Sequence, residues 1–151
     1  MMNSRHSIRT VLAAAAVVFG VAGCSVLQPN ANLAAFSTTM TGANEVPPVM
    51  TNATGTVYAQ LNTDTRLLKW KVSYNGLSGP ATMAHFHGPA VIGANAKVTL
   101  PFQPPVTSPF EGHATLTPEQ VTDLMAGKWY ANVHSAAHPG GEIRGQMILR
   151  K

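Results

Sequence analysis

Apolar and polar residues alternate along much of this chain with a period of two, which is typical of β-strands. The clearest example is residues 66–74, where the apolar positions share one face: Leu68, Trp70, Val72 and Tyr74. Residues 55–61 have the same character, and the polar run 62–65 between the two segments is a turn signal. These segments predict an antiparallel hairpin.

Further short segments have strand character and are separated by glycine, proline and asparagine: 81–87, 96–100, 110–116, 129–135 and 142–149. One segment has helical spacing instead. Thr117 and Gln120 form a Thr-x-x-Gln capping box, and Gly127 suits the position after the last turn, so we expect a helix over about 118–126. Many short strands with one short helix predict an all-β fold, an antiparallel β-sandwich or barrel.

The N-terminal residues have the features of an export signal. Arg5 and Arg9 precede an apolar run of 11 residues, Val11–Val21, which is too short to span a bilayer. Small residues then precede Cys24, as in a bacterial lipobox. We therefore expect a signal peptide over 1–23, a tether over 24–35 and a folded domain over 36–151. The alternative is an ordinary secretory signal that leaves one free cysteine.

Lipid on Cys24 would anchor the chain to a membrane through its buried CH₂ groups. Ser25 follows the cysteine and no Asp stands there as an inner-membrane retention signal, so we expect the periplasmic face of the outer membrane. Loss of Arg5 and Arg9 lowers the basic side chains from 10 to 8, against 6 acidic ones. No basic cluster remains, so nucleic-acid binding has no support.

Histidines give the strongest indication of function. His85 and His87 stand two apart in a predicted strand, so their imidazoles share one face. If the strand of His134 pairs nearby, three neutral nitrogens converge, which is enough to hold copper or, as the alternative, zinc. Met83 continues the same row and could add a thioether ligand for Cu(I). The competing interpretation is that these histidines only pack and hydrogen-bond to Asn132 or to backbone.

Two other histidines, His113 and His138, could enlarge this site or begin a second one. Exposed histidines near a loop can also be completed by a second copy of the chain, so a metal site shared across a homodimer is a further hypothesis.

Polar residues beside the histidines are candidates for supporting roles. Asn132 is expected to fix the tautomer of an imidazole. Glu142 and Arg144 share a strand face and are expected to hydrogen-bond to one another or to an adjacent loop, with Arg144 at the rim of the site. Glu45, in an extended segment, could pair with Arg144.

Six motifs occur together in order and spacing that resemble the CHRD domain, named for chordin: 42–48 (GANEVPP), 76–80 (GLSGP), 84–90 (AHFHGPA), 116–120 (LTPEQ), 130–134 (YANVH) and 140–146 (GGEIRGQ). The resemblance runs from about Phe36 to Leu149. It implies a Greek-key sandwich similar to that of copper/zinc superoxide dismutase, in which a His-x-His strand supplies copper ligands. The family pattern matches His85, His87 and His134, whereas His113 and His138 depart from it.

The resemblance attaches no enzymatic activity to the chain. We expect a lipid-anchored metal-binding module, with copper favoured, for storage, buffering or delivery outside the cytoplasm. The alternative is a structural or protein-interaction domain without metal, as chordin's extracellular antagonism of growth factors suggests. A superoxide dismutase-like enzyme is less favoured. Such enzymes have a further copper ligand, a zinc subsite with an Asp and a disulfide, and a chain whose single cysteine carries lipid cannot form a disulfide.

Overall fold

The computed structural model describes residues 32–150. The predicted signal peptide, most of the tether and the lipidation site at Cys24 lie outside these residues. Across residues 32–150, no helix has both the length and the apolar character needed to cross a membrane.

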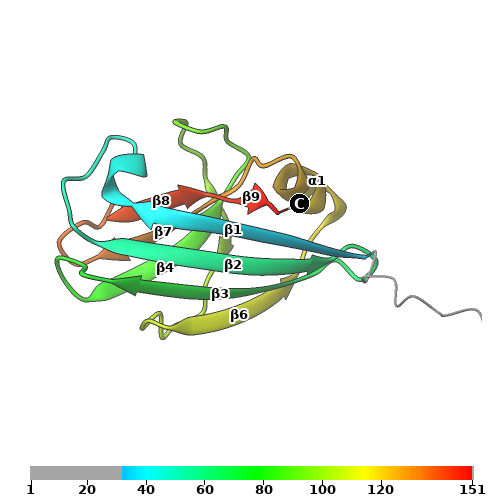
Figure 1. Cartoon of the computed structure of the whole chain (residues 1–151), viewed down its shortest axis with the longest axis horizontal. Helices are drawn as coiled ribbons and strands as arrows, with labels where there is room; N and C mark the ends of the chain where they lie inside the picture. Colours follow the sequence, from blue (N-terminus) through cyan, green and yellow to red (C-terminus); the bar gives the residue numbers. More distant parts are fainter. Residues whose placement is uncertain (1–31, 151) are drawn as a thin grey trace, which may run out of the picture.

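The described residues form one curled antiparallel sheet of nine strands with a single short α-helix (Figure 1). The elements in chain order are β1 (Leu33–Thr41), the 3-10 turn η1 (Gly42–Asn44), β2 (Thr54–Asn62), β3 (Leu67–Asn75), β4 (Ala81–His87), β5 (Val98–Pro101), β6 (Phe110–Thr115), α1 (Pro118–Met125), β7 (Tyr130–Ser135), β8 (Ile143–Gln146) and β9 (Ile148–Leu149). The order across the sheet is β5-β4-β7-β8-β1-β2-β3-β6, and β9 pairs with β1.

The sheet curls where β1 meets β8. Only one register pair, Thr41 with Arg144, joins these two strands. A Cβ on Gly145 would come within 2.4 Å of the Thr38 hydroxyl oxygen, so the close approach of the strands requires a glycine at this position.

The two halves of the curled sheet face each other across the core. Trp70 of β3 meets Phe86 of β4 edge-on, with ring centroids 5.6 Å apart. The fold is therefore a half-barrel, which confirms the antiparallel all-β prediction in its general form; the likeness to copper/zinc superoxide dismutase stays a prediction.

Local sequence signals account for the predicted hairpin and helix. In β3, Leu68 and Val72 are fully buried, as the alternation predicted. In the helix, the Thr117 side chain accepts from the Gln120 backbone N–H, and the Gln120 side chain accepts from the Thr117 N–H. Gly127 follows with a φ of 69°, the left-handed conformation that ends a helix. Both elements are confirmed.

Strand β1 was not predicted, and it begins at Leu33, three residues inside the segment expected to be tether. Its alternation is weak, because only Phe36 and Met40 along it are buried. The strand is defined by its neighbours instead: every residue of β1 has a register partner in β2.

Candidate metal centre

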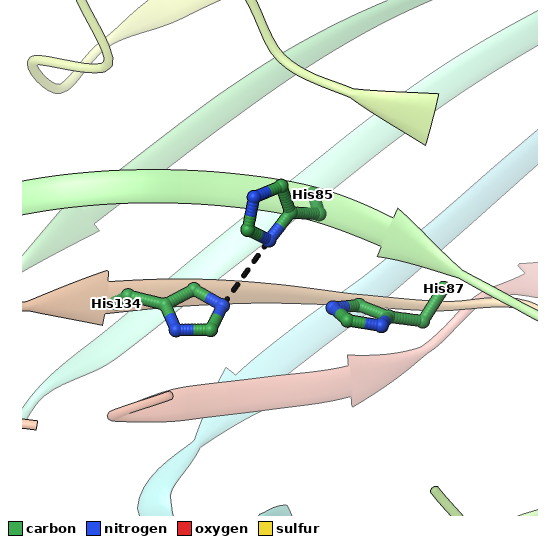
Figure 2. A group of neighbouring side chains, drawn as sticks. All are labelled: His85, His87 and His134. Carbon is green, nitrogen blue, oxygen red and sulfur yellow. Dashed lines mark hydrogen bonds between the residues drawn. The ribbon is translucent and has the colours of Figure 1, made fainter. Parts of the chain in front are cut away.

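Three histidines from two adjacent strands converge on one face of the sheet. His85 and His87 lie on β4 and His134 lies on the neighbouring β7, where the register places His85 opposite Asn132. One nitrogen from each ring falls within a group whose members all lie within 4.8 Å of one another. Figure 2 shows the three rings pointing toward a common point. The predicted convergence is therefore present, and it forms within one chain.

Strand alternation explains which face carries the histidines. Ala84 and Phe86 of β4 point into the core and are buried, so His85 and His87 point to the opposite face. The side chains of His87 and His134 are only 9% and 7% exposed, whereas His85 is partly exposed. A group held in this way is shielded from most of the solvent but stays accessible through His85.

Backbone carbonyls hold two of the rings by the nitrogen that faces away from the group. His87 Nδ1 lies 3.0 Å from the Ala96 carbonyl oxygen, and His134 Nδ1 lies 2.8 Å from that of Pro139. Since a carbonyl only accepts, each Nδ1 must carry the proton. In the neutral rings, each Nε2 then presents a lone pair to the centre of the group. This is the arrangement by which proteins orient metal-binding imidazoles.

The surroundings of His85 and His87 favour their neutral forms. Burial, followed by the proximity of His134 and His87, lowers the pKa of His85 to about 4. Burial also lowers the pKa of His87, although hydrogen bonds with Ala96 and Asn132 oppose the shift. Protons therefore compete weakly with a metal at neutral pH, because a ligand imidazole must be unprotonated.

Asn132 completes the inner side of the group. Its side chain is 3% exposed, and its Oδ1 lies 3.1 Å from both His87 Nε2 and His134 Nε2. His85 Nδ1 lies 3.2 Å from the same His134 nitrogen. Asn132 therefore contacts the same ring nitrogens that converge in the group, while its predicted role in fixing an imidazole tautomer stays a prediction.

The Tyr130 ring lies between His87 and the Arg144 guanidinium. The Tyr130 ring stacks on His87 at 4.7 Å between centroids, and the Arg144 guanidinium lies 3.4 Å from the Tyr130 ring centroid. Arg144 also donates to Asn95 Oδ1 and to the Ala94 carbonyl. It thus fixes the loop that provides the carbonyl held by His87. The contact of Tyr130 with His87 was not predicted, although its place two residues before Asn132 on the same strand face was a usable signal.

The Glu142 carboxylate accepts hydrogen bonds from neighbouring segments and none from Arg144. Its carboxylate accepts from the Thr51 hydroxyl, from the backbone N–H and hydroxyl of Ser78, and from the Ser135 hydroxyl. Burial alone would raise the pKa of this carboxyl, but these hydrogen bonds hold it below its usual value. Of the two arrangements predicted for Glu142 and Arg144, the one with adjacent loops is therefore observed.

Glu45 lies behind Asn132 and is 6% exposed. Burial raises the pKa of its carboxyl to about 7, against the opposing effects of the Arg144 charge and the Asn132 amide. The predicted ion pair of Glu45 with Arg144 is absent from the described residues as a direct contact. Gly141, with a φ of 121°, makes room for the carboxylate: a Cβ there would lie 2.5 Å from Glu45 Oε1 and 2.8 Å from Asn132 Nδ2.

The remaining candidates lie around or away from the group. His113 is on β6, opposite Lys69 and at the other end of the strand order, and His138 is in the loop between β7 and β8. Neither ring belongs to the three-histidine group. Met83 is opposite His134 in the register and 46% exposed, so it borders the group at the surface, where its role as a ligand stays a prediction.

Comparison with known proteins places the chain in a family. The model of the CHRD domain matches residues 36–147, and the chain therefore belongs to the CHRD domain family. No curated protein and no solved structure matches the chain. The residues matched by the family include the whole three-histidine group, so a group that could hold a metal lies within the CHRD domain itself.

Proposed function

We propose that this CHRD domain binds a transition metal, with copper favoured and zinc as the alternative, and that it stores, buffers or delivers this metal outside the cytoplasm. The observation that carries the proposal is the convergence of three imidazole nitrogens, two of them oriented by backbone carbonyls through the opposite ring nitrogen. Neutral imidazoles suit copper and zinc, and copper binds such donors most tightly of the divalent first-row ions.

The competing interpretation is a structural or interaction domain without metal. One observation favours it: both ring nitrogens of His87 and of His134 already lie within hydrogen-bonding distance of protein oxygens. However, all four of these oxygen contacts can be hydrogen bonds only if both rings carry two protons, and burial lowers the pKa of His87. The metal-binding interpretation does not require this buried double charge, and we prefer it.

A titration of the purified protein with Cu²⁺ and with Zn²⁺ tests the proposal. Stoichiometric binding should disappear in His85→Ala and in His87→Ala. His113→Ala and His138→Ala are matched controls that remove an imidazole outside the group, and both should bind like the wild type. Full retention of binding in His85→Ala and His87→Ala would refute the proposal.

Thermal unfolding supplies an independent measurement. A metal that binds only the folded state raises the free energy of unfolding by about 2.7 kcal/mol at a concentration 100 times its dissociation constant. The melting temperature of the wild type should therefore rise on adding Cu²⁺ or Zn²⁺. An unchanged melting temperature with both ions would favour the domain without metal.

We further propose that lipid on Cys24 holds the domain at a membrane on the periplasmic side. The lipobox-like sequence before Cys24 supports this part of the proposal. Replacement of Cys24 by serine should release the protein from the membrane fraction. We also propose binding without catalysis, which rapid superoxide turnover by metal-loaded protein would contradict.

A further inference from the structure

The buried side chain of Asn132 reaches into the group of three histidines. It projects from β7 between His87 and His134, and its Oδ1 lies 3.1 Å from the Nε2 of each ring. These are the two rings whose Nδ1 atoms face backbone carbonyls. The amide is 3% exposed, so water has little access to this position. A buried amide oxygen facing two ring nitrogens requires a physical explanation.

Hydrogen bonding to the rings does not explain it. Because His87 and His134 each hold a carbonyl with Nδ1–H, their Nε2 atoms are acceptors when the rings are neutral. Asn132 Oδ1 is an acceptor as well. Three lone pairs therefore meet at close range, and a cation at their centre would convert this repulsion into coordination.

Three of the distances in the group have the length expected for ligands of one ion, whereas the three histidine nitrogens lie within 4.8 Å of one another, so the rings must close in on a bound ion. Ligands bound tetrahedrally at about 2.0 Å are separated from one another by about 3.3 Å, as simple geometry requires. Three contacts in the group have nearly this length: His85 Nδ1 to His134 Nε2 at 3.2 Å, and Asn132 Oδ1 to His87 Nε2 and to His134 Nε2 at 3.1 Å each.

The surroundings of the amide favour this orientation of its oxygen. The Nδ2 end of Asn132 lies on the side of the Glu45 carboxylate, and both groups border the Cα of Gly141. An amide nitrogen facing an ionised carboxylate can donate to it, whereas the opposite orientation would bring two acceptor oxygens together. The ionised form of Glu45 therefore favours the orientation in which Asn132 Oδ1 faces the histidines.

We propose that Asn132 Oδ1 is the fourth ligand of the metal held by His85, His87 and His134. This inference rests on the proposed metal binding and adds an oxygen to the three nitrogens. An oxygen donor is a harder ligand than a thioether, so the site should favour divalent ions over Cu(I).

The test compares the binding of Zn²⁺, and of Co²⁺ as a spectroscopic probe, in variants of the purified protein. Asn132→Ala should weaken Zn²⁺ binding by at least about 10–100-fold, the loss typical when only an outer partner of a metal ligand is removed. It should also change the visible Co²⁺ spectrum, because the ion loses one protein donor. Circular dichroism should confirm that the variant is folded.

A rescue experiment separates coordination from positioning. In the Glu45→Gln background, where no second carboxylate faces residue 132, Asn132→Asp retains an oxygen at this position. This double variant should bind Zn²⁺ at least as tightly as Glu45→Gln alone, whereas Asn132→Ala in the same background should bind weakly.

The outcomes are distinguishable. If Asn132→Ala matches the wild type in Zn²⁺ affinity and Co²⁺ spectrum while His85→Ala loses binding, the metal site stands and the fourth ligand is overturned. If the aspartate fails to rescue, Asn132 only positions the rings, and the inference is likewise overturned. If the wild type itself binds neither Zn²⁺ nor Cu²⁺, both proposals are wrong.

Discussion

Replacement of Glu142 by glutamine should destabilise the fold by about 2–3 kcal/mol. The carboxylate is fully buried and accepts four hydrogen bonds from Thr51, Ser78 and Ser135. A hydrogen bond to a charged group contributes about 1 kcal/mol more than one to a neutral group, which gives about 4 kcal/mol for four bonds. The lower desolvation cost of the neutral amide offsets part of this loss.

Urea unfolding, followed by the fluorescence of the buried Trp70 and Trp129, measures this effect at pH 7. Glu111→Gln is the matched control. The Glu111 carboxylate lies 3.3 Å from Lys71 Nζ, but its side chain is 70% exposed, so we expect a change below about 0.5 kcal/mol. If the Glu142 variant is as stable as the Glu111 variant, the reasoning is refuted.

The pH dependence of the same variant provides a second check. Hydrogen bonds hold the folded-state pKa of Glu142 below 4.5, the value for the unfolded chain. The stabilisation is therefore complete above about pH 4.5 and decreases as the pH falls through the folded-state pKa. The difference between wild type and Glu142→Gln should persist at pH 5 and narrow in more acidic solution.

Three further substitutions test the surroundings of the histidines. Because the folded-state pKa of Glu45 is raised to about 7, the stability of the wild type decreases as the pH rises through 7. In urea unfolding, Glu45→Gln should therefore be more stable than the wild type by under about 1 kcal/mol at pH 5 and by about 2–3 kcal/mol at pH 8. His85 has a folded-state pKa of about 4, so the stability of the wild type decreases as the pH falls from 6.5 to 4. Between these pH values, the free energy of unfolding of His85→Gln should fall by about 1 kcal/mol less than that of the wild type. This value is reduced because the ring is partly exposed. Gly141→Ala should lower the free energy of unfolding in urea by at least about 2 kcal/mol, because the added Cβ would meet Glu45 Oε1. Gly140→Ala is the control: no atom lies within 4 Å of its added Cβ, so the free energy of unfolding should fall by under about 0.5 kcal/mol. Equal losses for the two variants would contradict the proposed crowding at Gly141.

Elements whose signals are local could be predicted from the sequence. The alternation in residues 66–74 identified β3, and the capping box at Thr117 identified the helix. The pairing of His85 and His87 on one face followed directly from the period of two in a strand. Strand β1 escaped prediction because its polar run gives little alternation and its position depends on pairing with β2.

The sequence by itself determined the residue types of the candidate site: two imidazoles on one strand and a third on another. Only the tertiary structure decided that β7 lies beside β4, which brings His134 within 3.2 Å of His85. It also decided that the carbonyls of Ala96 and Pro139 hold the rings. The reason is physical: every residue carries the same backbone carbonyl, so no sequence pattern marks the one that will accept from a histidine. The proximity of Glu45 to Asn132 likewise joins segments far apart in the chain, and such a contact leaves no periodic signal in the sequence.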